Sequence, residues 1–88
     1  MKTLIDFYAD WCGPCIAMKP FVDQVEKDFK DKLTVRNVNV DEDSNDAAKY
    51  GVVSLPTFII LDEEGKVVAK RLGASPKDQF LEWVKANL

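Results

Sequence analysis

The sequence contains no histidine and only two cysteines, Cys12 and Cys15. A pair with this spacing can supply half of a zinc site, but zinc takes four ligands, so carboxylates or a second chain would have to provide the others. A disulfide between the two would close only a very small loop, and such loops stabilise a fold much less than links between distant segments. The pair is therefore better suited to redox chemistry than to holding the chain together.

The chain also lacks any cluster of lysine and arginine, because acidic and basic residues are interleaved and the net charge is −3. Without such a cluster, nucleic acids and anionic membranes are not expected partners. The longest strictly apolar run, Phe58–Leu61, is far too short to cross a membrane. Asp6 interrupts the one N-terminal stretch that resembles an export signal, so we expect a cytoplasmic protein.

What the 88 residues do contain is typical of a globular protein, with 47% hydrophobic and 31% charged residues. A chain of this length can build one hydrophobic core, and no linker, repeat or low-complexity segment divides it. We therefore expect a single domain over residues 1–88.

The N-terminal half predicts two strands, each followed by a helix. The run Leu4–Tyr8 is apolar except for one aspartate, which fits a strand buried on both faces. Apolar residues then recur at helical spacing over Gly13–Lys30. The segment Leu33–Val40 is rich in β-branched residues and predicts the second strand. After it, Asp43 or Ser44 can cap a short helix.

The C-terminal half predicts a hairpin and a last helix. Thr57–Leu61 and Lys66–Arg71 flank an acidic loop that ends in Gly65, so they are expected to pair in antiparallel fashion. Ser75 can cap the last helix, with Pro76 at its first position. Strands that alternate with helices place the chain in the α/β class.

The Cys12-Gly13-Pro14-Cys15 segment has the spacing of a redox-active dithiol. Disulfide exchange needs one thiolate that attacks and a second cysteine close enough to resolve the mixed disulfide. Cys12 falls at the expected start of a helix, where unpaired N–H groups and the helix dipole favour a negative sulfur. An inert structural pair is the alternative, although Trp11, Gly13 and Pro14 favour an exposed turn over a packed interior.

The residues around this dithiol resemble the active-site segment of the thioredoxin family, Asp6-Phe7-Tyr8-Ala9-Asp10-Trp11-Cys12-Gly13-Pro14-Cys15. Further segments match the family in order along essentially the whole chain: Pro20, Asp41, Lys49-Tyr50-Gly51, Leu55-Pro56-Thr57, Leu72-Gly73-Ala74 and Ala86-Asn87-Leu88. The resemblance implies a thioredoxin-like βαβαββα fold with helices on both faces of a mixed sheet. Its four strands would be ordered Leu33–Val40, Leu4–Tyr8, Thr57–Leu61, Lys66–Arg71.

The resemblance also implies a thiol-disulfide oxidoreductase that reduces protein disulfides. In that role Cys12 attacks the substrate disulfide, Cys15 resolves the mixed disulfide, and Asp6 moves protons to and from Cys15. A carboxylate in an apolar strand loses hydration, so the pKa of Asp6 is expected to rise. The alternative is an aspartate at a strand edge with its carboxylate in water.

Substrate contacts are assigned by the same resemblance to residues around the dithiol: Trp11, Gly13, Pro14, Leu55, Pro56 and Gly73. A cis bond before Pro56 would leave the backbone of Leu55 free to pair with an extended substrate segment. Without the family match, Pro56 would equally fit the plain start of a strand, and Gly73 a plain turn.

The sequence departs from the family's usual pattern at two places. Asn37 stands where thioredoxins commonly carry a lysine near the buried acid, so Asp6 is expected to lack its usual cation and to have a higher pKa than in relatives. Met1 stands almost directly before the active-site strand, so the usual first strand and helix are expected to be missing. The strand Leu33–Val40 would then be an edge; a monomer is expected, and a dimer paired through this edge is the alternative.

The resemblance implies no bound cofactor and no metal. The expected partners are disulfide-containing proteins and a reductase of the thioredoxin-reductase type that returns the electrons. Glutaredoxins usually have Pro-Tyr between the cysteines, and disulfide oxidases or isomerases usually have a histidine there, so both classes fit less well. The remaining alternative is a binding subunit with a thioredoxin fold whose cysteines are dispensable.

Overall fold

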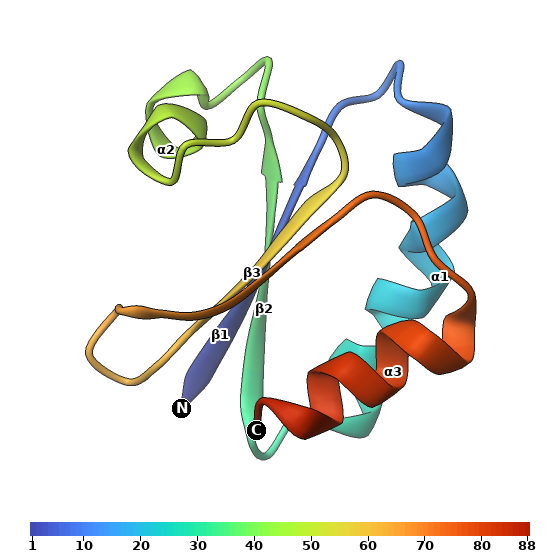
Figure 1. Ribbon diagram of the computed structural model, residues 1–88, viewed down its shortest axis with the longest axis vertical. Helices are drawn as coiled ribbons and strands as arrows, with labels where there is room; N and C mark the ends of the chain where they lie inside the picture. Colours follow the sequence, from blue (N-terminus) through green and yellow to red (C-terminus); the bar gives the residue numbers. More distant parts are fainter.

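A computed structural model describes residues 1–88 and shows a four-stranded sheet flanked by helices on both faces (Figure 1). Along the chain the elements are β1 (Lys2–Tyr8), α1 (Gly13–Asp28), β2 (Leu33–Asn39), α2 (Ser44–Lys49), β3 (Thr57–Leu61), β4 (Val67–Leu72) and α3 (Lys77–Ala86). The predicted element order and α/β class are confirmed. No helix combines the length and apolar character needed to cross a bilayer.

The strand order is β2-β1-β3-β4, as predicted. β1 pairs in parallel with β2, and α1 forms the crossover between them. β3 runs antiparallel to both β1 and β4. β1 therefore lies between two neighbours, and its C-terminal end leads directly into the turn that carries the two cysteines.

One face of the sheet is covered by α1 and α3, which pack beside each other (Figure 1). The sheet contributes Leu4, Phe58 and Ile60 to this core, and the helices contribute an apolar stripe that repeats every three to four residues. The rings of Phe58 and Phe80 lie 4.8 Å apart between centroids, in a tilted arrangement. The buried residues of this layer are Leu4, Met18, Val22, Val25, Leu33, Phe58, Ile60, Phe80 and Val84.

The opposite face of the sheet is covered by the short helix α2 and the segment that follows it (Figure 1). Ile5 and Phe7 alternate with Leu4 along β1 and point to this side, which explains why the strand is apolar on both faces. Asp43 caps α2, because its Oδ1 accepts a hydrogen bond from the Asp46 N–H at 3.2 Å. Asp46 in turn accepts from Arg36 on β2 at 2.8 Å.

Several predicted boundaries were wrong by one or two residues. α1 ends at Asp28 instead of Lys30. Ser75 does not cap α3, which has Pro76 at its N-cap, and the buried Ser75 hydroxyl has no hydrogen-bond partner. The hairpin is longer at its turn than predicted, because Asp62 Oδ1 accepts hydrogen bonds from the N–H groups of Glu64 and Lys66 and so holds both in the loop.

Candidate active site

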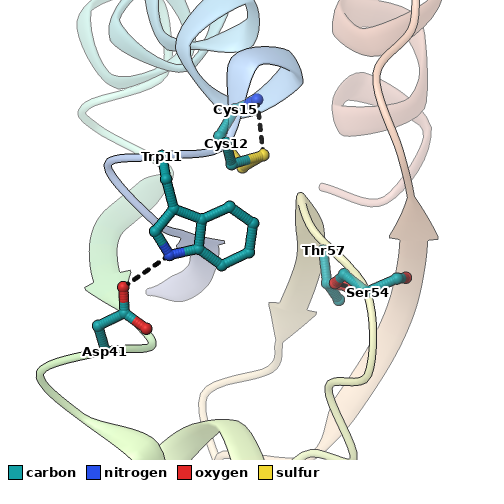
Figure 2. The surroundings of a disulfide bond; sticks show 6 residues. All are labelled: Trp11, Cys12, Cys15, Asp41, Ser54 and Thr57. Carbon is teal, nitrogen blue, oxygen red and sulfur yellow. Dashed lines mark hydrogen bonds between the residues drawn. A yellow bond between two sulfur atoms is a disulfide. The ribbon is translucent and has the colours of Figure 1, made fainter.

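Cys12 and Cys15 form a disulfide at the N-terminus of α1, with their Cα atoms 5.2 Å apart (Figure 2). Cys12 is the N-cap residue, and its Sγ accepts a hydrogen bond from the Cys15 N–H at 3.2 Å. A turn closed by the Cys12 N–H on the Ala9 carbonyl, at 3.1 Å, brings the chain from β1 into the helix. Pro14 lies in the first turn, where its missing N–H costs no hydrogen bond. The sequence thus places a sulfur where the helix dipole stabilises negative charge.

Trp11 is anchored beside the disulfide although its side chain is 72% exposed. Its indole Nε1–H donates to Asp41 Oδ2 at 2.8 Å, and Figure 2 shows the ring extending from the disulfide towards that carboxylate. Asp41 is itself fixed, because its backbone N–H donates to Oδ1 of the buried Asn39 at 3.0 Å. The contact between Trp11 and Asp41 was not predicted, since nothing in the spacing of two residues 30 positions apart indicates it.

A groove of about 450 Å³ runs past the disulfide on the side of Cys12. Seven of its ten lining residues are apolar, which suits a partner that brings apolar side chains. Of the predicted substrate contacts, Trp11, Gly13, Pro14 and Leu55 border this groove. The full lining is Trp11, Cys12, Gly13, Pro14, Val40, Ala47, Val52, Val53, Ser54 and Leu55. Sequence reasoning missed the other five lining residues, which are Val40, Ala47 of α2, Val52, Val53 and Ser54.

The Leu55–Pro56 peptide bond is cis, as the family resemblance implied. The backbone N–H and carbonyl of Leu55 make no hydrogen bond within the chain. The neighbouring backbone is held in place, because Thr57 Oγ1 donates to the Ser54 carbonyl at 2.7 Å (Figure 2). The Leu55 backbone is therefore unpaired where it lines the groove, between two residues joined by a hydrogen bond.

Pro56 and Gly73 do not border the groove themselves. The Gly73 N–H donates to the Pro56 carbonyl at 2.8 Å, so the two residues are held next to each other. Gly73 has a φ of +82°, a backbone conformation that favours glycine, and no atom lies within 4 Å of where a Cβ would stand. The turn geometry alone accounts for this glycine, and the open space beside it is compatible with a partner's approach.

Asp6 lies in the middle of β1 with only 6% of its surface exposed. Its register partners are Asn37 on β2 and Phe58 on β3, and neither carries a charge. Its Oδ1 is buried without a hydrogen-bond partner. This loss of hydration raises the pKa of Asp6 to about 6; Lys19 on α1 acts to lower the pKa and Asp23 to raise it.

A second cavity, of about 210 Å³, lies on the Cys15 side of the disulfide. Asp6 and Cys15 both border it, whereas Cys12 borders only the groove. The remaining residues around this cavity are Tyr8, Ala9, Asp10, Ile16, Lys19 and Asn37. The two cysteines of one disulfide thus face two different spaces, one a mostly apolar groove and one a cavity next to a buried acid. No group of three or more histidine, cysteine or acidic side chains is placed to hold a metal ion.

This dithiol site stands in a chain whose residues 1–86 match the family profile described as Thioredoxin. The chain belongs to the thioredoxin family. It is 40% identical to the thioredoxin of Rhodospirillum rubrum over 84 residues, which cover 96% of the chain and 80% of the relative. It is also 40% identical to the thioredoxin of Bacillus subtilis over 86 residues, covering 98% of the chain and 82% of the relative.

The thioredoxin of Chlorobaculum thiosulfatiphilum is 39% identical over 86 residues, which are 98% of the chain and 79% of that relative. Because Cys12 and Cys15 occupy the dithiol position of the family and lie at disulfide distance, the protein is a dithiol–disulfide reductase that acts on protein disulfides. The predicted thioredoxin resemblance, fold and reductase activity are confirmed.

Lys19 is the residue near Asp6 that the sequence analysis missed. The absence of a lysine at position 37 suggested that Asp6 has no cation nearby, and no ion pair to Asp6 is formed. Lys19 nevertheless borders the Asp6 cavity from the helix side. Its spacing of four residues from Cys15, one helical turn, was the signal that could have revealed it.

Proposed function

We propose that Cys12 is the attacking nucleophile, that Cys15 resolves the mixed disulfide, and that Asp6 takes the proton of Cys15. The observation that carries this assignment is the division of the site into two spaces. Cys12 borders the groove in which a protein partner can lie, and Cys15 borders the cavity that contains the carboxylate. The position of Cys12 at the N-cap favours the thiolate form of that cysteine.

The first step starts from the reduced protein. The Cys12 thiolate attacks one sulfur of a substrate disulfide, so that a bond forms between Cys12 Sγ and that sulfur. The substrate's own sulfur–sulfur bond breaks, and its second sulfur leaves as a thiolate. Protein and substrate are now joined by a mixed disulfide between Cys12 and the substrate, and no electron donor is consumed in this step.

The second step needs a thiolate on Cys15. Asp6, whose pKa of about 6 lies near neutrality, accepts the Cys15 proton across the cavity that both residues border. The Cys15 thiolate then attacks Cys12 Sγ and releases the substrate's first sulfur as a thiolate. The substrate leaves with two electrons gained, and the protein is left with the Cys12–Cys15 disulfide that the structure contains.

Substrate binding is proposed to use both the groove and the free backbone of Leu55. An extended segment next to the substrate disulfide can donate to and accept from Leu55 as a short added strand. Its apolar side chains would lie in the groove against Trp11 and Leu55, with Gly13 and Pro14 leaving Cys12 accessible. Pro56 and Gly73, joined by a backbone hydrogen bond, would hold the chain that follows Leu55 in place.

Return of the electrons requires a donor, proposed to be a reductase of the thioredoxin-reductase type, so that the protein serves as an electron carrier. The cytoplasm is the compartment in which dithiols of this kind are kept reduced, and we propose it as the site of action. A monomer is proposed, because Thr34, Arg36 and Asn37 place exposed polar side chains on the β2 edge and discourage pairing with a second copy.

The reduction potential of the Cys12–Cys15 pair, measured by equilibration with dithiothreitol buffers, tests the proposed direction of transfer. We expect a value near −270 mV, the one known for thioredoxins. A value of about −200 mV or above would contradict a reductase role and favour glutaredoxin-like or oxidising exchange. Failure to form the disulfide would instead favour a binding subunit.

Replacing Asp41 by alanine is expected to weaken substrate binding, because it frees the Trp11 indole from its 2.8 Å hydrogen bond. An exposed hydrogen bond of this kind contributes about 0.5 to 1 kcal/mol, so KM for reduction of insulin should rise about two- to fivefold with kcat nearly unchanged. Glu42→Ala is the matched control, since Glu42 is an exposed acid next in sequence that does not bond to Trp11. Equal effects of the two variants would contradict a role for the anchor.

A further inference from the structure

The Asp6 carboxylate faces a cavity in which almost nothing balances its charge. It is 94% buried, and its Oδ1 lacks any hydrogen-bond partner. The strand on one side offers the neutral amide of Asn37 and the strand on the other offers the ring of Phe58. Neither neighbouring strand places a positive charge opposite this carboxylate. Stabilisation of its ionised form must therefore come from charges on the helix that covers it.

Helix α1 presents Cys15, Lys19 and Asp23 at successive turns, so these residues follow one another along the same face. Lys19 borders the cavity together with Asp6 and Cys15. Its side chain is exposed, and it forms no ion pair with any carboxylate. The ammonium group therefore stays hydrated while its charge acts on Asp6 across the cavity.

The other groups around Asp6 do not supply a positive charge within the cavity. From β1 and the turn after it, Tyr8 and Asp10 line the cavity. From α1, Asp23 opposes Lys19. From the sheet, Arg36 on β2 pairs with Ile5, so its side chain lies on the opposite face, where it binds Asp46. Arg71 on β4 pairs with Phe58 and so lies one strand further away. Helix α3 contributes apolar residues to the core on this face, including Phe80.

We propose that Lys19 is a positioning residue for Asp6: from the exposed side of α1 it stabilises the carboxylate across the cavity and sets the pH at which Asp6 takes the proton of Cys15. This inference rests on the proposed role of Asp6 and deepens it. It places the cation on the helix that also carries Cys15, instead of on β2, where Asn37 stands.

The weakness of this contact is part of the proposal. A close ion pair would hold Asp6 ionised down to acidic pH, and a carboxylate with such a low affinity for protons is a poor base for a thiol. Lys19, hydrated and opposed by Asp23, stabilises the carboxylate only partly. Asp6 thus keeps a proton affinity suited to exchange near neutral pH.

The test follows the Asp6 carboxyl by carbon-13 NMR as a function of pH in the oxidised protein, in which the cysteines do not titrate. Lys19→Met keeps the length of the side chain and removes its charge, and it is expected to raise the Asp6 titration midpoint by about 0.5 pH unit. Asp23→Asn removes the opposing charge and should lower the midpoint. Lys19→Arg should leave it near the wild-type value.

Lys27→Met is the matched control, because Lys27 is an exposed lysine of the same helix that does not border the cavity. It should leave the midpoint unchanged, and the shift in Lys19→Met should shrink in 1 M salt because Lys19 is exposed. A midpoint in Lys19→Met that equals the wild-type value overturns the inference. So does an equal shift in Lys27→Met, which would show a general effect of net charge.

A kinetic measurement separates this inference from the proposed function. In Lys19→Met the pH profile of mixed-disulfide resolution is expected to move to higher pH by the same amount as the titration midpoint, with its plateau unchanged. A profile that stays in place overturns the assignment of Lys19 as a positioning residue. An Asp6→Asn variant that resolves the mixed disulfide at the wild-type rate overturns the proposed role of Asp6 itself, whatever the titration shows.

Discussion

Replacing Cys12 by serine is expected to reduce insulin reduction to the rate of the uncatalysed reaction with dithiothreitol, a loss of roughly 1,000-fold or more. The physical reason is that a hydroxyl at the N-cap of α1 is not ionised at neutral pH, whereas a thiol in that position is readily converted to the attacking thiolate. The protein should keep its fold, because the change replaces one sulfur by an oxygen at the N-cap of α1, a position at which serine is a favoured residue.

Cys15→Ser is the informative companion variant. In the proposed mechanism it retains the attacking thiolate of Cys12 but lacks the sulfur that completes the exchange, so it should accumulate a stable mixed disulfide that intact-mass spectrometry detects. If Cys12→Ser instead forms the mixed disulfide and Cys15→Ser does not, the two roles are reversed. If Cys12→Ser loses reduction but still binds partner proteins with wild-type affinity, binding in the groove is separable from the chemistry.

Replacing Asp6 by asparagine is expected to stabilise the oxidised protein at pH 8 by up to about 3 kcal/mol. Burial raises the pKa of this carboxyl from 3.8 to about 6. Each unit of difference between the pKa in the folded state and the pKa in the unfolded state corresponds to about 1.4 kcal/mol of stability. The buried amide that replaces the acid also lacks a full set of partners, so the gain should fall below this upper value.

The folded protein binds the Asp6 proton more tightly than the unfolded chain does, and this difference sets how stability changes with pH. Between pH 3.8 and about 6 the folded protein holds a proton on Asp6 that the unfolded chain has lost, so the free energy of unfolding falls as the pH rises. The destabilisation is complete above the folded pKa. Urea denaturation at about pH 4 and pH 8 should therefore show little difference between wild type and Asp6→Asn at the lower pH and the full difference at the higher one.

Asp31→Asn is a suitable control, because Asp31 is an exposed aspartate in the turn between α1 and β2. A pH-independent gain in Asp6→Asn would contradict the desolvation of this carboxyl. Asp6→Asn should also resolve the mixed disulfide about 100-fold more slowly at pH 7, since the proposed base for Cys15 is lost. A variant that is more stable but reacts more slowly is expected when an ionisable group is buried for its function at a cost in stability.

The fold was predictable because local patterns and tertiary packing agree over most of the chain. β1 is apolar on both faces, and α1 carries its apolar residues at helical spacing, so each pattern had one consistent interpretation. Ser75 shows where this reasoning fails: serine before proline at a predicted helix start looks like a cap, but the helix begins after Pro76 and the hydroxyl is left buried and unpaired.

The site was predictable only where its residues lie in one contiguous motif. The dithiol and its position at the start of a helix could be predicted from spacing, and burial of Asp6 followed from its apolar strand. The Trp11–Asp41 hydrogen bond and the approach of Lys19 to Asp6 join elements that are distant in sequence or lie on different layers. Such contacts are fixed by how the elements pack. The one-turn spacing of Lys19 from Cys15 places both on one helix face, but it does not show that this face meets Asp6.

The separation of the groove from the acid cavity has a consequence for how such a protein can diversify. A substitution at Val40, Val52 or Val53 changes the groove in which we propose that a partner lies, and none of these residues touches the cavity beside Asp6. A substitution at Lys19 or Asn37 changes the charge around the acid and leaves that surface alone. The proposed roles of the two spaces therefore predict that a lineage can change partner choice and working pH independently of each other.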